Sequence, residues 1–407
     1  MKIIRLCGAL ALGALVAGFA TPAQAEDDLY PVGTISSMWW PQNMIGSYRH
    51  WDEIFAVREI SRGDGLVFPL IEGEVFEVYD FDYRGGRRLV ADYMEDNRVT
   101  GLLVLHGGLI RMERYAYGAD ETSLSTSQSV AKSIVSTLVG RAIHDGLIES
   151  VDEPIDRYVP ALAQTGYAGV PIEAVLQMSS GIRYNEDYDD PNSDVSLMWT
   201  QAAERHTRPI NDFLLDYRAQ RAPGTVYNYK GADTQALAWM LMEVTGMNLA
   251  DYASAALWQP LGMEADASWM VDGRGDDAVE IAFTGVNARL RDYGRFGLLM
   301  AQDGMWEDQR LLPEGWVQQA TVPSTPQVQP GELYQGYPLG YQYQWWTLPW
   351  GDGVFTAQGV NGQFVYVDPA NDLVVVQTAV WRDWWVDEAE EEFYALARSL
   401  TEVLSHQ

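Results

Sequence analysis

Cysteine is almost absent from this chain, and its absence removes several kinds of chemistry. The only cysteine among the 407 residues is Cys7, which lies in an N-terminal segment typical of a cleaved secretory leader. After cleavage no thiol would remain. We therefore expect the exported protein to have no disulfide bond, no thiolate metal site and no cysteine nucleophile.

The leader itself is predicted from a short charge and hydropathy pattern. Lys2 and Arg5 precede an apolar stretch at positions 9–20, and Ala23-Gln24-Ala25 supplies small residues for cleavage. We predict a signal peptide over 1–25 and a periplasmic or extracellular protein. The remainder has no uninterrupted apolar run of bilayer length, so we expect no membrane insertion after the signal is removed.

Positive charge is scarce as well. The sequence has 27 lysines and arginines against 57 aspartates and glutamates, a net charge of −30 that becomes −32 without the leader. This balance argues against nucleic acid and anionic membranes as partners. The acidic residues are scattered, which is typical of a solvated surface.

The acidic loop 187–194 lacks the glycine and the bidentate glutamate of a calcium loop, and we expect no metal and no cofactor.

Lysine is the rarest cation, with only Lys2, Lys132 and Lys230 beside 24 arginines. Arginine keeps its proton at any working pH, whereas a lysine amine can lose it when it is desolvated. The two lysines outside the leader therefore mark positions where a titratable amine could be needed. We expect Lys132 to act in catalysis and Lys230 to lie on the surface.

Ser129 precedes Lys132 by three residues in a segment with helical periodicity from Ser129 to Asp145. This spacing places both side chains on one helix face, one turn apart. Lysine buried at a helix N-terminus can lose its proton and activate the serine hydroxyl as a nucleophile, while the free backbone N–H of Ser129 can donate to an oxyanion. We expect Thr126 or Ser127 to cap the helix. The alternative is a capping serine beside a solvated lysine.

A Ser-His-Asp hydrolase is a rival interpretation that the sequence disfavours. Such enzymes place the serine in a Gly-x-Ser-x-Gly turn, whereas Ser129 is flanked by Ser127 and Ala131 at those positions. The chain has five histidines in all. His106 is predicted in a turn and His144 far along the nucleophile's helix, so neither is well placed as a base.

Strands are predicted at both ends of the chain. Residues 99–105 and 109–115 form a hairpin through a His-Gly-Gly turn, and 363–367 with 373–377 form a second one. Further helices are predicted over 232–244, before Gly246, and over about 387–404. The fold class that we predict is α+β, with an antiparallel sheet built from both ends of the chain, flanked by helices, and an inserted helix-rich lobe.

The corresponding organisation has one catalytic unit after the leader. We predict an N-terminal extension over 26–91 that packs on the core, an α/β sheet region over 92–150 and 276–407, and a helical lobe over 151–275. The sequence does not indicate an oligomeric state.

Several segments in order resemble the serine beta-lactamase and penicillin-binding-protein superfamily. They are the Ser129-x-x-Lys132 helix, Leu176 to Gly181, Pro223 to Tyr229, Pro260 to Met263, and Gly359 to Gln363 with Val367 to Pro369. The class C-like branch is the most similar, with its family VIII carboxylesterases, D-aminopeptidases and 6-aminohexanoate-dimer hydrolases. The loop Asn185 to Pro191 resembles the active-site loop of the last group, which places Tyr188 in the substrate pocket.

The resemblance implies roles for further residues. Tyr229 in Tyr229-Lys230-Gly231 matches the tyrosine of the second motif, which relays a proton to the leaving group, although the usual polar third residue is glycine here. Ala357-Gln358-Gly359 stands where the family has Lys-Thr-Gly or His-x-Gly. Gln358 and Gly359 would contact substrate, and the N–H of Val360 would be the second oxyanion donor.

The missing cation of that third motif weakens recognition of a substrate carboxylate such as that of a beta-lactam. We therefore expect a secreted serine hydrolase that cleaves ester or amide bonds of small molecules through an acyl-enzyme on Ser129, of the 6-aminohexanoate-dimer hydrolase or carboxylesterase type. The alternatives are a D-aminopeptidase, a carboxypeptidase or a weak beta-lactamase. An inactive binding protein that keeps the fold is an alternative of another class.

Overall fold

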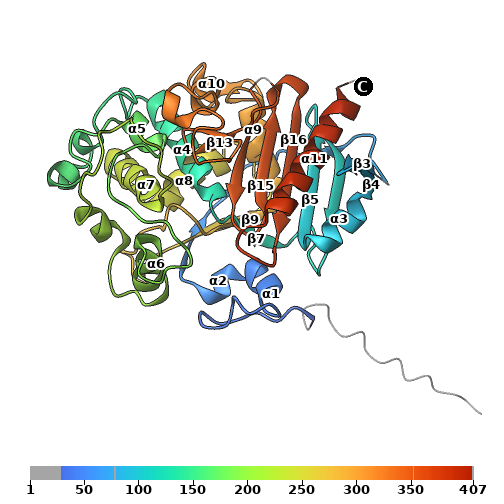
Figure 1. Cartoon of the computed structure of the whole chain (residues 1–407), viewed down its shortest axis with the longest axis horizontal. Helices are drawn as coiled ribbons and strands as arrows, with labels where there is room; N and C mark the ends of the chain where they lie inside the picture. The colour runs from blue at the N-terminus through green and yellow to red at the C-terminus, as the bar shows by residue number, and fades with distance from the viewer. Residues whose placement is uncertain (1–28, 78, 352, 406–407) are drawn as a thin grey trace, which may run out of the picture.

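The computed structural model describes residues 29–77, 79–351 and 353–405 (Figure 1). The predicted signal peptide lies outside the described residues. An eight-stranded sheet dominates, in the order β12-β13-β14-β15-β16-β5-β6-β2. Its strands are β12 Gly340–Gln342, β13 Trp345–Thr347, β14 Phe355–Gly359, β15 Gln363–Asp368, β16 Leu373–Ala379, β5 Val99–His106, β6 Leu109–Tyr115 and β2 Ile71–Glu72.

This sheet is built from both ends of the chain, as predicted, because β16 pairs antiparallel with β5 at its centre. Both predicted hairpins are present, β5–β6 and β15–β16. All pairs in the sheet are antiparallel except the edge pair, in which β2 runs parallel to β6. The α+β prediction is therefore confirmed, with this parallel edge strand as an addition.

The central strands are covered on both faces. Leu103 and Leu105 of β5 pack with helix α9 (Leu290–Ala301), whereas Leu102 and Val104 pack with helix α11 (Asp387–Leu404) on the opposite face. The alternation follows from the two-residue repeat of a strand. Helix α9 lies so close to the sheet that a Cβ at its Gly297 would stand 2.5 Å from Val374 Cγ1. Helix α3 (Val90–Asp96) also contacts β5.

A second sheet of four strands joins distant parts of the chain. Its order is β1-β8-β9-β7, and the strands are β1 Val57–Ile60, β8 Ala267–Met270, β9 Val286–Arg289 and β7 Leu124–Thr126. Strand β1 comes from the predicted N-terminal extension and β8 from within the range predicted as helical lobe. The division into extension, sheet region and lobe stays a prediction.

Most of the remaining helices lie to one side of the large sheet (Figure 1). They are α4 Val130–His144, α5 Ile172–Leu176, α6 Asp194–Met198, α7 Gly231–Thr245 and α8 Leu249–Ala253. Helix α7 ends where predicted, at Gly246, whose φ of 68° is a left-handed conformation that glycine adopts without strain. In the described part of the chain, no helix combines the length and apolar content that crossing a bilayer requires.

Smaller elements complete the molecule. Helices α1 Met44–Arg49 and α2 Trp51–Ile54 precede β1, and the hairpin of β3 Asp80–Tyr83 with β4 Gly86–Leu89 packs beside α11. The hairpin of β10 Met305–Trp306 with β11 Gln309–Arg310 and helix α10 Trp316–Thr321 follow α9. The N-terminal helices contact the turn between β14 and β15 through Tyr48, whose hydroxyl donates to Asn361 Oδ1 at 2.7 Å.

Candidate active site

A strand, a strained turn and a helix place Ser129. Strand β7 ends at Thr126, and the chain turns through Gln128, whose φ of 44° lies in the left-handed region. Helix α4 then begins at Val130, with Ser129 as its N-cap residue. The predicted caps Thr126 and Ser127 are wrong, because Thr126 belongs to the strand and the Ser127 hydroxyl instead accepts the N–H of Val286 at 3.1 Å. Such strain is common where a functional side chain is held in place.

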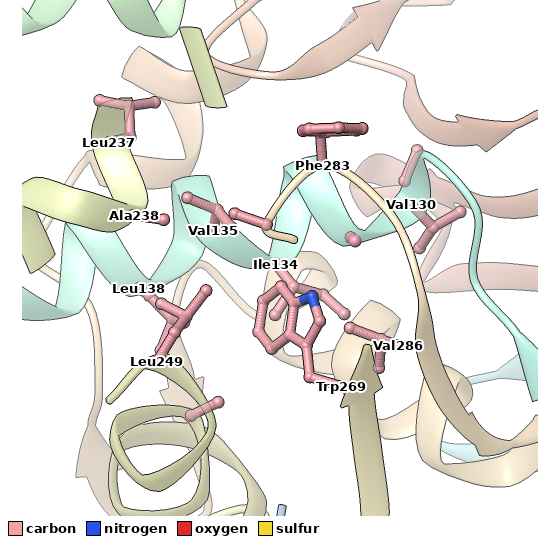
Figure 2. Packing of buried hydrophobic residues seen from close by; sticks show 14 of the residues in the cluster. Val130, Ile134, Val135, Leu138, Leu237, Ala238, Leu249, Trp269, Phe283 and Val286 are labelled. Atoms are coloured by element: carbon pink, nitrogen blue, oxygen red, sulfur yellow. The ribbon is translucent and has the colours of Figure 1, made fainter. Parts of the chain in front are cut away.

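Helix α4 is fixed by its apolar residues. Val130, Ile134 and Leu138 repeat at helical spacing and lie beside Trp269 and Val286 of the four-stranded sheet (Figure 2). All five are buried. The helix predicted over this segment is therefore confirmed, and the packing of its first turns holds Ser129 in place.

Lys132 is buried next to Ser129. Its Nζ lies 2.9 Å from Ser129 Oγ and donates to the carbonyl of Phe283 at 3.0 Å. The side chain is 2% exposed, and the rings of Tyr229 and Phe283 lie 4.9 and 5.4 Å from Nζ. This burial lowers the pKa of Lys132 from 10.5 to about 8. About a tenth of the amine is therefore neutral at pH 7, and about half at pH 8.

Glu186 is a site residue that the sequence analysis did not single out. It opposes the loss of the lysine charge, because its carboxylate raises the pKa of Lys132 while burial lowers it. Glu186 Oε2 accepts the N–H of Gly231 at 2.9 Å, at the positive N-terminus of α7. Oε1 accepts the hydroxyl of Tyr188 at 3.0 Å. Burial raises the pKa of Glu186, which the nearby lysine and these hydrogen bonds counteract.

Tyr229 lies directly before α7, with its ring near the amine of Lys132. Its ring stacks on Trp346 at a centroid distance of 5.7 Å. Burial raises the pKa of the Tyr229 hydroxyl, and a hydrogen bond with the Ser129 side chain lowers it. The structure thus brings together the three residues predicted as catalytic: Ser129, Lys132 and Tyr229.

Strand β14 ends against the backbone of Ser129. A Cβ added to Gly359 would stand 2.7 Å from Ser127 O, 2.9 Å from Gln128 Cβ and 3.0 Å from Ser129 N. Only glycine permits this approach. The next residue, Val360, lines the space around Ser129, next to the strand end that approaches the Ser129 N–H.

Two connected cavities of about 350 and 460 Å³ meet at Ser129. They share Ser129, Glu186, Tyr188, Val360 and Trp384. The first is lined further by Asp187, Tyr229, Tyr334, Tyr337, Trp346, Gln358, Gly359 and Trp385. The second is lined further by Trp39, Gln128, Lys132, Asp189, Pro191, Val195, Ser196, Trp199, Thr200, Phe283, Thr284 and Asn361. The predicted pocket residues Tyr188, Gln358 and Gly359 all border the first cavity.

The tryptophans near Ser129 divide between the cavities and the core. Trp39, Trp346, Trp384 and Trp385 line the cavities. Trp345 is instead fully buried and stacks on Phe296. A one-residue step along a strand reverses the side-chain direction, which separates Trp345 from Trp346.

Lys230 is not a surface residue, which corrects the expectation from the sequence. It is fully buried, with Nζ 3.1 Å from Met178 O and 3.3 Å from Asp233 Oδ2. The other oxygen of Asp233 accepts the hydroxyls of Ser180 and Tyr167. A buried lysine needs such partners because its unpaired charge would be very costly. Lys230 and Asp233 both lie at the start of α7, next to Tyr229. Their hydrogen bonds with Met178 O and the Ser180 hydroxyl join this helix start to the turn after α5.

Among the residues that the structure describes, no histidine lines the cavities at Ser129. His50, His106, His144 and His206 border neither cavity at Ser129, and His406 lies outside the described residues. His206 is engaged elsewhere, with Nδ1 2.8 Å from the carbonyl of Asp272. Lys132 is therefore the basic side chain next to the serine.

Comparison with known proteins places these features in a family. The model of the family described as Beta-lactamase matches residues 87–397. A 6-aminohexanoate-dimer hydrolase of Paenarthrobacter ureafaciens is 32% identical over 297 residues, which cover 71% of this chain and 74% of that protein.

Solved structures share the fold. A Bacillus anthracis protein assigned as a 6-aminohexanoate-dimer hydrolase superposes with a TM-score of 0.81 and 21% identity, over 94% of this chain and 99% of that one. A class C beta-lactamase gives a TM-score of 0.54 and 16% identity, over 76% and 94% of the two chains.

Proposed function

Because this chain belongs to the beta-lactamase family and is a serine hydrolase of that family, we propose that it cleaves ester or amide bonds of small molecules through an acyl-enzyme on Ser129. The observation that carries this proposal is the 2.9 Å contact between Ser129 Oγ and the Nζ of Lys132 in a desolvated setting. A neutral amine at this distance can remove the hydroxyl proton as the oxygen attacks.

The proposed reaction has two halves. In the first, Ser129 Oγ bonds to the substrate carbonyl carbon, the hydroxyl proton passes to Lys132 Nζ, and the bond to the leaving group breaks. The leaving oxygen or nitrogen takes a proton through the Tyr229 hydroxyl. In the second, water attacks the acyl carbon and gives one proton to Lys132 Nζ. That proton passes to Ser129 Oγ as the ester bond to Ser129 breaks, and a carboxylic acid leaves.

The backbone is proposed to stabilise the negative oxygen of both tetrahedral intermediates. The N–H of Ser129 at the start of α4 and the N–H of Val360 after β14 are the two donors. Two backbone donors fixed before the reaction stabilise a developing oxyanion without reorganisation. The close approach of Gly359 to Ser129 N supports this arrangement, since it holds the two donors near each other.

The substrate class that we propose is a linear amide or ester of the 6-aminohexanoate-dimer type. The 32% identical relative supports it, as do the two cavities that both border Ser129. Within the described residues, Lys132 is the only lysine or arginine that lines these cavities. A substrate carboxylate, including the terminal one of an aminohexanoate dimer, would therefore have to stay in solvent instead of pairing with a second cation. The leader pattern in the sequence supports a proposal that the enzyme acts outside the cytoplasm.

A covalent probe and one substitution test the proposal. We expect a fluorophosphonate to add its mass to the peptide that contains Ser129. Ser129→Ala should lower the turnover of a p-nitrophenyl ester by a factor of about 10⁴ or more, as loss of a nucleophile does in other serine hydrolases. Ser405→Ala, at an exposed hydroxyl beyond α11, is the matched control and should keep wild-type turnover.

Two results would count against the proposal. One is an unlabelled Ser129 together with undiminished activity of Ser129→Ala. The other is a wild-type protein that turns over no ester, linear aminohexanoate dimer, D-amino-acid amide or cephalosporin, which would favour a binding protein. Preferred turnover of the cephalosporin would favour the beta-lactamase alternative.

A further inference from the structure

Glu390 is a buried carboxyl group that the reaction above does not use. It lies on α11, on the face turned toward the large sheet, and is 7% exposed. Its neighbours Glu388 and Glu391 are exposed in the same acidic run, as expected for a charged helix at the surface. A carboxyl group is rarely buried without a specific set of partners.

The partners of Glu390 come from three separate segments that line the first cavity. The hydroxyl of Tyr337, in the loop before β12, donates to Glu390 Oε1 at 3.3 Å. The amide of Gln358, on β14, approaches the same oxygen at 3.4 Å. The indole of Trp385, before α11, also donates to this carboxyl group.

All three of these side chains border the cavity at Ser129. Trp346 and Trp384 line the same cavity, and we call these five side chains together the aromatic wall. Tyr337 also packs edge-to-face on Trp346 at a centroid distance of 5.5 Å. The hydroxyl of Tyr394, also on α11, is hydrogen-bonded to the amide of Gln358 and so helps to fix the position of that side chain. One carboxyl group therefore ties three parts of the wall together.

We propose that Glu390 is a positioning residue, whose carboxylate holds the aromatic wall in the shape that binds substrate. This inference rests on the proposed hydrolase function but concerns a residue that contacts no reacting atom. A carboxylate accepts hydrogen bonds at both oxygens, whereas the protonated acid has less capacity to accept and must itself donate. The charged form should therefore hold the wall more firmly than the neutral form.

The protonation of Glu390 falls in a range that an enzyme assay can reach. Burial raises its pKa to about 7, with Asp387 on the same helix contributing, while its hydrogen bonds lower it. A groove of about 480 Å³ between the β3–β4 hairpin and α11 also borders Glu390, so solvent protons have a route to it. The titratable and charged groups that line this groove with it are Asp82, Tyr83, Arg84, Tyr337, Asp387, Glu391, Tyr394 and Arg398.

The test compares KM and kcat of wild type and Glu390→Gln for a p-nitrophenyl ester between about pH 6 and about pH 8. In wild type, KM should rise about fivefold as the pH falls through this range, because a hydrogen bond to a charged acceptor is lost. Glu390→Gln cannot become charged. Its KM should be high throughout and independent of pH, with kcat within about twofold of wild type.

A matched control and a second variant complete the design. Glu391→Gln changes the adjacent exposed carboxylate, which pairs with Arg84, and should keep the wild-type KM and its pH dependence. Glu390→Leu removes all acceptors and should raise KM further. Thermal unfolding of each variant shows whether a loss reflects the fold.

The outcomes separate this inference from the proposed function. If wild type turns over no substrate and its Ser129 is not labelled, the proposed function fails. If wild type is active and Glu390→Gln retains a pH-dependent KM equal to that of wild type, the positioning role alone is overturned. A fall in kcat with unchanged KM in a folded Glu390→Gln variant would also overturn it.

Discussion

At the scale of single residues, the titration of Lys132 should govern activity. The amine must be neutral to accept the Ser129 proton, and burial lowers its pKa to about 8. About a tenth of the enzyme would be in the competent form at pH 7. We expect kcat/KM for an ester to rise about tenfold per pH unit in the acidic range and to level off above about pH 8.

The sign follows from the lysine being active only when it has lost its proton. The expected profile belongs to the free enzyme, so kcat/KM rather than kcat is the quantity to plot. Glu390→Gln is a useful background for this measurement, because it removes the second group that titrates nearby. A flat profile from about pH 6 to about pH 8 would exclude Lys132 as the base.

Ser129 and Lys132 could be predicted because their relation is local. Three residues on a helix fix the two side chains to one face, and the scarcity of lysine made the pair conspicuous. Glu186 had no such signal. Its partners Gly231 and Lys132 are more than forty residues away in the sequence, so its role depends on how distant segments pack.

The surroundings of the two lysines outside the leader also depend on packing that the sequence does not show directly. Scarcity made both positions conspicuous, but Lys230 was expected on the surface and is instead buried. Lys132 faces aromatic rings and keeps a lowered pKa, whereas Lys230 pairs with Asp233. The Asp233 partner three residues after Lys230 was a visible helical spacing that could have predicted the ion pair.

At the scale of elements, the end of β14 leaves no room for added volume next to Ser129. Gly359→Ala would force a methyl group into Ser127 O and Ser129 N, and the strand would have to move away from the nucleophile. We expect kcat to fall by a factor of about 10² to 10³, as when one oxyanion donor is lost. The effect should be measured as kcat for an ester.

Gly86→Ala is the control for this substitution. Gly86 lies in the exposed β3–β4 hairpin, where the nearest atom to a new Cβ is 3.9 Å away. It should keep wild-type activity. If Gly359→Ala also kept wild-type kcat while folding normally, the close approach of β14 would have no catalytic role.

Sheet hairpins and long helices were the elements that sequence patterns predicted well. The predicted ranges of the two hairpins and of α11 agree with the structure nearly to the residue. Each has a repeat that is local, either alternation or helical periodicity, bounded by glycine or a turn. Which side chains of α11 are buried was harder to predict. Glu390 and Glu392 are buried within a run of acidic residues, because their partners belong to other elements.

At the scale of the whole molecule, the acidic surface should make stability depend on salt. Acidic residues outnumber basic ones by 57 to 27, so repulsion among unpaired carboxylates outweighs the attraction within ion pairs. Added salt screens charges over a distance of about 10 Å at 0.1 M. We expect Tm to rise by several degrees as NaCl increases from about 10 mM to about 0.5 M.

The measurement is thermal unfolding followed by circular dichroism at constant pH. Choline chloride can replace NaCl to show that screening rather than a bound sodium ion is responsible. A Tm that stays constant or falls with either salt would mean that ion pairs such as Arg291 with Glu113 dominate the electrostatic balance.

N-terminal residues border the candidate active site although they precede the region that the family model matches. Trp39 lines the second cavity, and Tyr48 is hydrogen-bonded to Asn361 beside Val360. The match to the family begins at residue 87. A gene fragment that encodes only residues 87–397 would yield a protein without Trp39 and Tyr48, and its second cavity would lose part of its lining. Boundaries for cloning or domain fusion therefore have to follow the packing and not the family match.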